Sequence, residues 1–169
     1  MYKIVLSILL ILIPTLSTSA ATQVSSRNTY FASTDRVYSE LFDNKLISES
    51  VWKALLNQTH YLFFTGKLNP KAIYIASLNF ASDILEEGNA STSMKSVKDG
   101  YYALSKEIYY GLYMKKYITQ EEYGQELSQI WEYIYNANST PRKIYDTALE
   151  YKKNTELEYK TQLTRTMTH

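Results

Sequence analysis

The sequence contains no cysteine and only two histidines, three prolines and five glycines among its 169 residues. Without cysteine the chain forms no disulfide and offers no thiolate to a metal ion. Its glycines occur singly, so it has no glycine-rich loop of the kind that binds phosphate. The low glycine and proline content argues against a loop-rich chain, and the 45% apolar content argues against a disordered one. These absences favour one compact domain.

The chain also lacks a surplus of either charge, with 18 Lys and Arg against 17 Asp and Glu. Residues 21–97 carry seven charges of each sign, and residues 98–169 carry ten of each. Nucleic-acid-binding proteins need a basic surplus to neutralise phosphates, and neither half has one. We therefore expect no nucleic-acid partner. After residue 20 we also expect no membrane span, because no later segment is long and apolar enough.

The first twenty residues resemble a secretory signal peptide in their order of charge and polarity. Lys3 precedes an apolar stretch over residues 4–16, and the small residues 17–21 follow it. We expect cleavage after Ala20, with Ala21 as the alternative. An uncleaved anchor is the competing interpretation, but thirteen residues span only about 20 Å as a helix, short of the roughly 30 Å hydrocarbon core. Export without cysteine favours a bacterial periplasm or bacterial secretion.

The most informative pattern is an internal repeat with an offset of 71 residues. When residues 30–86 are placed on residues 101–157, twelve of 57 positions are identical without a gap. Self-similarity at a fixed period is typical of duplicated structural units. We therefore predict one repeat over 21–97 and a second over 98–169. The identical pairs include Tyr30 with Tyr101, Tyr38 with Tyr109, Leu41 with Leu112, Pro70 with Pro141 and Tyr74 with Tyr145.

Each repeat has the signals of three helices. In the first repeat, apolar residues at helical spacing predict a helix over 28–44, Ser48 predicts the start of a second that stops at Gly66, and Asn69-Pro70 predicts a third that ends near Glu87. The fold we expect is all-α, with six helices in two pseudo-equivalent sets. Seventy residues is close to the lower limit for an independent core, so the sets should pack together as one bundle or a short solenoid.

The second repeat carries the same signals in different residues. Thr119 and Glu122 predict a capping box for its middle helix, and Thr140-Pro141 predicts the start of its last helix. A similar box, Ser96 to Asp99, is expected to open its first helix. The small polar residues 89–96 are the expected linker between the repeats.

No group of residues predicts catalysis, and we expect neither a metal nor a cofactor. His60 aligns with Trp131 in the other repeat and is expected to be a packing residue. The carboxylate pairs Glu86-Glu87 and Glu121-Glu122 lie at predicted helix ends, where they have ordinary structural roles. A nucleophile motif such as G-x-S-x-G is absent. We therefore predict that the protein is not an enzyme.

Tyrosine is concentrated in the second repeat, where 12 of the 17 tyrosines lie beyond residue 98. Tyrosine is favoured at interfaces because its ring offers a large contact area and its hydroxyl a polar tip. The competing interpretation is that the helix near 101–117 is central and that its phenols bond internally. The residues that we expect to bind a partner are Tyr102, Tyr110, Tyr113, Tyr117 and Trp131.

The sequence thus predicts an exported, non-catalytic helical protein that binds another protein in the periplasm. Inhibitors, immunity factors, secretion or conjugation accessories and lysis regulators all fit this description. A second copy of the chain is a further option for the partner, giving a homodimer. The alternative function is a small-molecule or peptide binding module, with its ligand in a cleft between the two repeats.

Overall fold

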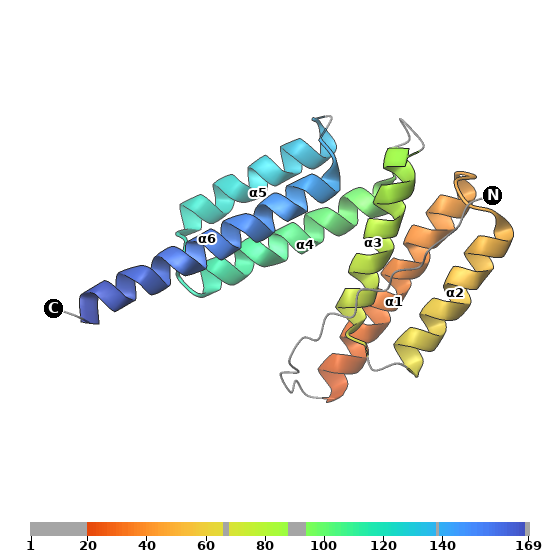
Figure 1. Cartoon of the computed structure of the whole chain (residues 1–169), viewed down its shortest axis with the longest axis horizontal. Coiled ribbons are helices and arrows are strands. Elements are labelled where there is room, and N and C mark those ends of the chain that lie inside the picture. The colour runs from red at the N-terminus through yellow and green to blue at the C-terminus, as the bar shows by residue number, and fades with distance from the viewer. Residues whose placement is uncertain (1–19, 66–67, 88–93, 138, 168–169) are drawn as a thin grey trace.

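The computed structural model describes residues 20–65, 68–87, 94–137 and 139–167, and these ranges contain six α-helices and no strand (Figure 1). The expected all-α class and number of helices are therefore confirmed for the described residues. Residues 1–19 of the leader, the stop expected at Gly66 and most of the expected linker lie outside those ranges. The helices are α1 (Ala20–Asp43), α2 (Glu49–Phe64), α3 (Pro70–Glu87), α4 (Lys95–Met114), α5 (Gln120–Tyr135) and α6 (Pro141–Met167).

Most helix ends lie where local signals place them. The Ser48 hydroxyl accepts a hydrogen bond from the Val51 amide at the start of α2. Thr119 and Glu122 form the complete capping box expected for α5. Pro70 and Pro141 occupy the first positions of α3 and α6, where a missing amide hydrogen removes no helical bond.

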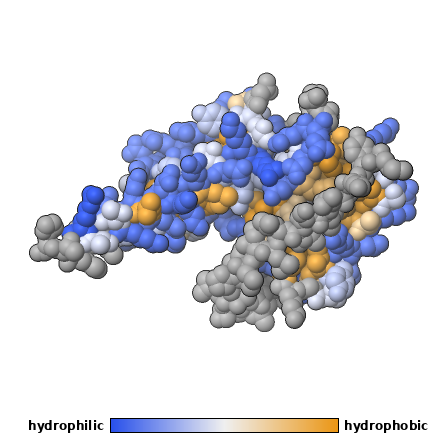
Figure 2. Space-filling view, viewed as in Figure 1, coloured by the Kyte–Doolittle hydropathy of each residue, from blue (hydrophilic) through white to orange (hydrophobic). Residues whose placement is uncertain are grey.

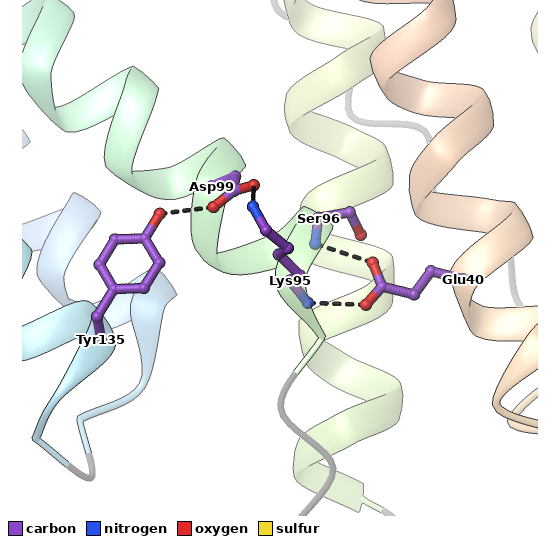
Figure 3. Close-up of polar contacts among 5 residues, drawn as sticks. All are labelled: Glu40, Lys95, Ser96, Asp99 and Tyr135. Carbon is purple, nitrogen blue, oxygen red and sulfur yellow. Dashed lines mark hydrogen bonds and ion pairs between the residues drawn. The ribbon is translucent and has the colours of Figure 1, made fainter.

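The start of α4 differs from the expectation, and the capping box predicted at Ser96 is wrong. The cap position is Met94, which provides no side-chain hydrogen bond, and Ser96 is buried inside the first turn. Instead the Glu40 carboxylate of α1 accepts hydrogen bonds from the amides of Lys95 and Ser96 at 2.7 and 2.8 Å (Figure 3). This carboxylate replaces a local cap and ties α1 to α4. The predicted boundary between repeats, 97/98, lies within this first turn.

The start of the first helix also differs, because α1 begins at Ala20 rather than near residue 28. The residues from 20 to 27 are polar or small and include no proline or glycine. They have no apolar stripe to mark them as helical, but nothing in them stops a helix that is stabilised further along the chain.

Two lysines in left-handed backbone conformation end α1 and α4 in the same way. Lys45 has φ 58° and Lys116 has φ 59°, a region where glycine is the usual residue. After each helix the amide two residues beyond the cap bonds back five residues, Leu46 to Leu41 and Tyr117 to Leu112. This pattern is a Schellman motif, and it directs the chain sharply into the next helix.

The buried side chains form two cores that share α4. The first core is built by α1, α2 and α3 around Leu41 and Leu78, and the first half of α4 adds Tyr101 and Leu104 to it. The second core lies between the rest of α4 and helices α5 and α6, around Leu112 and Ile130. We call α1–α3 the first trio and α4–α6 the second trio. Because α4 also packs on α1 and α3, it joins the two trios.

The two trios lie at an angle to each other, and the end of α6 projects beyond α4 and α5 (Figure 1). The face seen in Figure 2 is mostly hydrophilic over the second trio, and more apolar surface is visible on the first. Among the described residues, none of the helices combines the length and apolarity needed to cross a membrane.

Candidate binding surface

One end of the interface between α4 and α5 holds three aromatic rings. Tyr102 of α4 meets Tyr135 of α5 edge to face, with ring centroids 5.9 Å apart. Trp131, one helical turn before Tyr135, packs on the same ring at 5.7 Å. These pairs lie in the distance range in which aromatic rings attract each other beyond simple burial.

The other end of this interface holds three further rings. Tyr113 of α4 stacks on Tyr123 of α5 with centroids 5.4 Å apart and planes 14° from parallel. Tyr110 contacts the same Tyr123 ring at 6.2 Å. We call the set of six the α4–α5 aromatic strip: Tyr102, Tyr110, Tyr113, Tyr123, Trp131 and Tyr135.

Exposure within the strip is uneven. Tyr110 is 49% exposed and Trp131 is 47% exposed, whereas Tyr102 and Tyr113 are partly buried against α5. On a helix at 100° per residue, Trp131 points roughly opposite to Gln129 and Tyr133, which lie toward α6. The two exposed rings are therefore supported by partly buried ones, and Trp131 faces away from the α6 side of α5.

Four of the five expected binding residues lie in this strip, and the fifth does not. Tyr117 follows the end of α4 and packs on Tyr159 of α6, with centroids 4.4 Å apart. Sequence reasoning missed Tyr123 and Tyr135. Their spacing of eight and four residues from Trp131 places all three on one face of α5, which was a usable signal.

Polar contacts fix the Tyr135 ring. Its hydroxyl donates to Asp99 of α4 at 2.6 Å, and the Lys95 ammonium pairs with the same carboxylate (Figure 3). Burial opposes the charge of Asp99, but the hydrogen bonds from Lys95 and Tyr135 outweigh it and lower the pKa of this carboxyl. Burial and the Asp99 charge raise the pKa of the Tyr135 phenol, which therefore stays neutral.

A similar ring cluster lies along the interface between α1 and α2. Phe31 contacts His60 and Phe64 at 6.1 and 5.3 Å, and His60 contacts Phe64 at 4.7 Å. The Arg27 guanidinium lies 5.1 Å from the centre of the Phe64 ring. Phe31, His60 and Phe64 precede Tyr102, Trp131 and Tyr135 by 71 positions each. His60, which the sequence predicts as a packing residue, contacts the rings of Phe31 and Phe64 but is itself exposed.

A cleft of about 390 Å³ opens on the other side of α5, between α5 and α6. Tyr109 and Ile130, both nearly fully buried, and Ile144 form its apolar part. Burial, followed by a hydrogen bond to Glu126, raises the pKa of the Tyr109 phenol. The polar lining is Glu126, Gln129, Tyr133, Ser139, Thr140, Lys143 and Thr147.

The carboxylate pairs and histidine form no catalytic group with each other. Glu86 and Glu87 are exposed at the end of α3, and Glu122 accepts the bonds of the α5 capping box. Its hydrogen bonds from the Thr119 backbone and hydroxyl lower the pKa of Glu122. Within the described part of the chain, no three His, Cys, Asp or Glu side chains converge to hold a metal ion.

Comparison with known protein families, with curated proteins and with solved structures finds no match for this chain. Its function therefore has to be argued from its own surfaces.

Proposed function

We propose that this chain is an exported, non-catalytic helical protein that binds another protein through the α4–α5 aromatic strip. The observation that carries the proposal is the exposure of Tyr110 and Trp131 beside further rings along the α4–α5 interface. Trp and Tyr are the residues that most often dominate binding energy at protein interfaces. Rings held in place by neighbouring rings lose little conformational freedom on binding, which favours affinity.

The leader and the absence of cysteine support a periplasmic or secreted site of action. Inhibitors, immunity factors, secretion or conjugation accessories and lysis regulators act there by contact with a second protein. Expression in a bacterial host followed by mass spectrometry of the exported fraction tests this part. The expected mass is that of residues 21–169. A chain retaining residue 1 in the cytoplasm would contradict export.

We also propose that the two trios derive from one duplicated unit. Support comes from spacing: α2 and α5 begin at 49 and 120, α3 and α6 at 70 and 141, and the two left-handed lysines are 45 and 116. Each pair differs by 71, the offset of the sequence repeat. On this proposal the strip is one of two related aromatic clusters, one at the α1–α2 interface and one at the α4–α5 interface.

Partner binding is tested with a double variant, Tyr110→Ser with Trp131→Ala. The tagged protein is incubated with periplasmic extract of its source, and captured proteins are quantified against a Tyr61→Ser variant. Tyr61 is a matched control because its ring is 64% exposed on α2 and lies outside the strip. We expect the double variant to lose a partner that the wild type and Tyr61→Ser both retain.

Equal capture by all three proteins would contradict the strip as the binding surface. Light scattering on the purified chain distinguishes a second copy as the partner. In that case the wild type is a dimer, and the double variant is a monomer of unchanged helix content.

The alternative function is a binding module with a small ligand in a cleft between the two repeats. The α5–α6 cleft, by contrast, lies within the second trio.

A further inference from the structure

The α5–α6 cleft differs in character from the corresponding seam of the first trio. Moving 71 positions back along the chain from its lining residues gives the seam between α2 and α3. Three positions keep their residue, as Tyr38 and Tyr109 illustrate. Five polar residues of the cleft replace apolar ones: Glu126 for Leu55, Tyr133 for Leu62, Ser139 for Leu68, Lys143 for Ala72 and Thr147 for Ala76.

Only one of these replacements, Glu126 for Leu55, changes a buried position of the first trio, and at Ile130 the change runs the other way, from the buried Thr59. A carboxylate at a buried position weakens a helix–helix interface unless something uses it. Leu55 is buried in the first core, and replacing a buried leucine by a carboxylate removes packing and costs desolvation. The phenols show the same contrast. Burial raises the pKa of both phenols; a hydrogen bond to the Thr59 hydroxyl offsets part of that rise in the pKa of Tyr38, whereas a hydrogen bond to Glu126 adds to the rise in the pKa of Tyr109. Residues that lower the free energy of unfolding and are not needed by the fold are typical of functional sites.

The cleft contains two charged residues of opposite sign, Glu126 and Lys143, at different positions along the α5–α6 interface. Glu126 lies beside Tyr109 and near Tyr151, toward the middle of α6. Lys143 lies one helical turn before Thr147, nearer the α5–α6 connection. Among the described residues the Lys143 ammonium forms no ion pair. Ile130 and Ile144 form apolar surface in the same cleft.

We propose that the α5–α6 cleft binds a short zwitterionic peptide, with its ammonium on Glu126 and its carboxylate on Lys143. The isoleucines contact its small apolar side chains, and Gln129 and the surrounding hydroxyls are suited to its peptide group. The volume of about 390 Å³ falls within the range of small-ligand sites. The cleft lies on the side of α5 away from the aromatic strip, so this proposal stands apart from the proposed function.

The test is calorimetric titration of the full exported chain with alanyl-alanine as the probe. Blocking either terminus of the probe, as N-acetyl-alanyl-alanine or alanyl-alaninamide, should weaken binding by about tenfold or more, because each block removes one charge-assisted contact. Glu126→Gln should abolish the preference for a free ammonium, and Lys143→Met the preference for a free carboxylate. Lys153→Met is the control, since Lys153 is exposed on α6 and does not line the cleft.

The blocked probes test the proposal on the wild-type protein, so it stays falsifiable if a variant does not fold. Absence of alanyl-alanine binding would overturn it. Equal affinity for free and blocked peptides would also overturn it, as would tighter binding of the neutral sugar N-acetylglucosamine. Loss of partner capture in the strip variant with normal alanyl-alanine binding would show that the two surfaces are independent.

Discussion

At the scale of single residues, Gly100 has the least room of the glycines in the described part of the chain. A Cβ added there would lie 2.5 Å from the Tyr74 hydroxyl and 2.7 Å from a Leu78 methyl carbon. Such distances are far inside van der Waals contact, so α4 and α3 approach closely only because this residue has no side chain. The phenol of Tyr74 is already constrained: burial and the Asp99 charge raise its pKa to about 12.

We therefore predict that Gly100→Ala destabilises the fold by about 1–3 kcal/mol, the usual cost of overpacking a core. Gly111→Ala is the matched control in the same helix, because nothing lies within 4 Å of its added Cβ. That variant should gain about 0.5–1 kcal/mol from helix propensity. Urea denaturation followed by circular dichroism measures both. A Gly100→Ala variant as stable as Gly111→Ala would contradict the close approach.

At the scale of elements, the helix starts show which signals a sequence carries. Ser48 and Thr119 cap helices that begin immediately after them, so both caps can be predicted from the local sequence. The cap of α4 comes from Glu40, 55 residues earlier than Lys95. Only the packing of α1 beside α4 creates that contact, and the Ser96 pattern was therefore misleading.

We predict that Glu40→Ala destabilises the protein by about 1–2 kcal/mol, because it removes the acceptor of two amides at a helix start. Asp43→Ala is the control, since Asp43 is exposed at the end of α1, where a negative charge is not favoured. Its effect should stay within about 0.5 kcal/mol. Hydrogen exchange should localise the Glu40→Ala effect to the first turn of α4. Unchanged protection there would contradict the cap.

The aromatic strip belongs to the same scale. The tyrosines of α4 were recognisable as a group because one helix carries them all. Tyr123 and Tyr135 became part of the surface only through the antiparallel pairing of α4 with α5, in which Tyr102 meets Tyr135 and Tyr113 meets Tyr123. Sequence periodicity places Tyr123 and Tyr135 on the face of α5 that carries Trp131, but it does not show that this face meets the tyrosines of α4; that pairing comes from the fold.

The helix near 101–117 was expected to be either central or exposed, and it is both. Tyr101 is fully buried in the first core, and Tyr109 is buried in the second. Tyr110, next to Tyr109, is half exposed. Because adjacent residues of a helix point 100° apart, one helix can join two cores and still present a ring to solvent.

At the scale of the whole molecule, α4 is the helix that both cores share. It contributes Leu104 to the first core and Leu112 to the second, and both are almost fully buried. Unfolding either core removes the support for a shared helix. We therefore expect a single transition, although each trio has its own buried cluster.

The two tryptophans report separately on this transition. Trp52 packs on the first core and Trp131 lies in the second trio, so Trp131→Phe and Trp52→Phe each leave one reporter. Both variants should unfold in urea with the same fluorescence midpoint. Lys106→Pro, at an exposed site in the middle of α4, should separate the two midpoints because proline breaks the shared helix. Different midpoints without the proline would contradict cooperativity.

The most direct measurement of the central claim, that the α4–α5 aromatic strip is a protein-binding surface, is site-specific photo-crosslinking in the exporting cell. A benzophenone side chain replaces Trp131 or Tyr110 in one pair of strains and Tyr61 in the control. We predict that both strip positions yield the same covalent adduct with one other polypeptide and that position 61 does not. Adducts at position 61 alone, or equal adducts at all three positions, would contradict the α4–α5 aromatic strip as the binding surface.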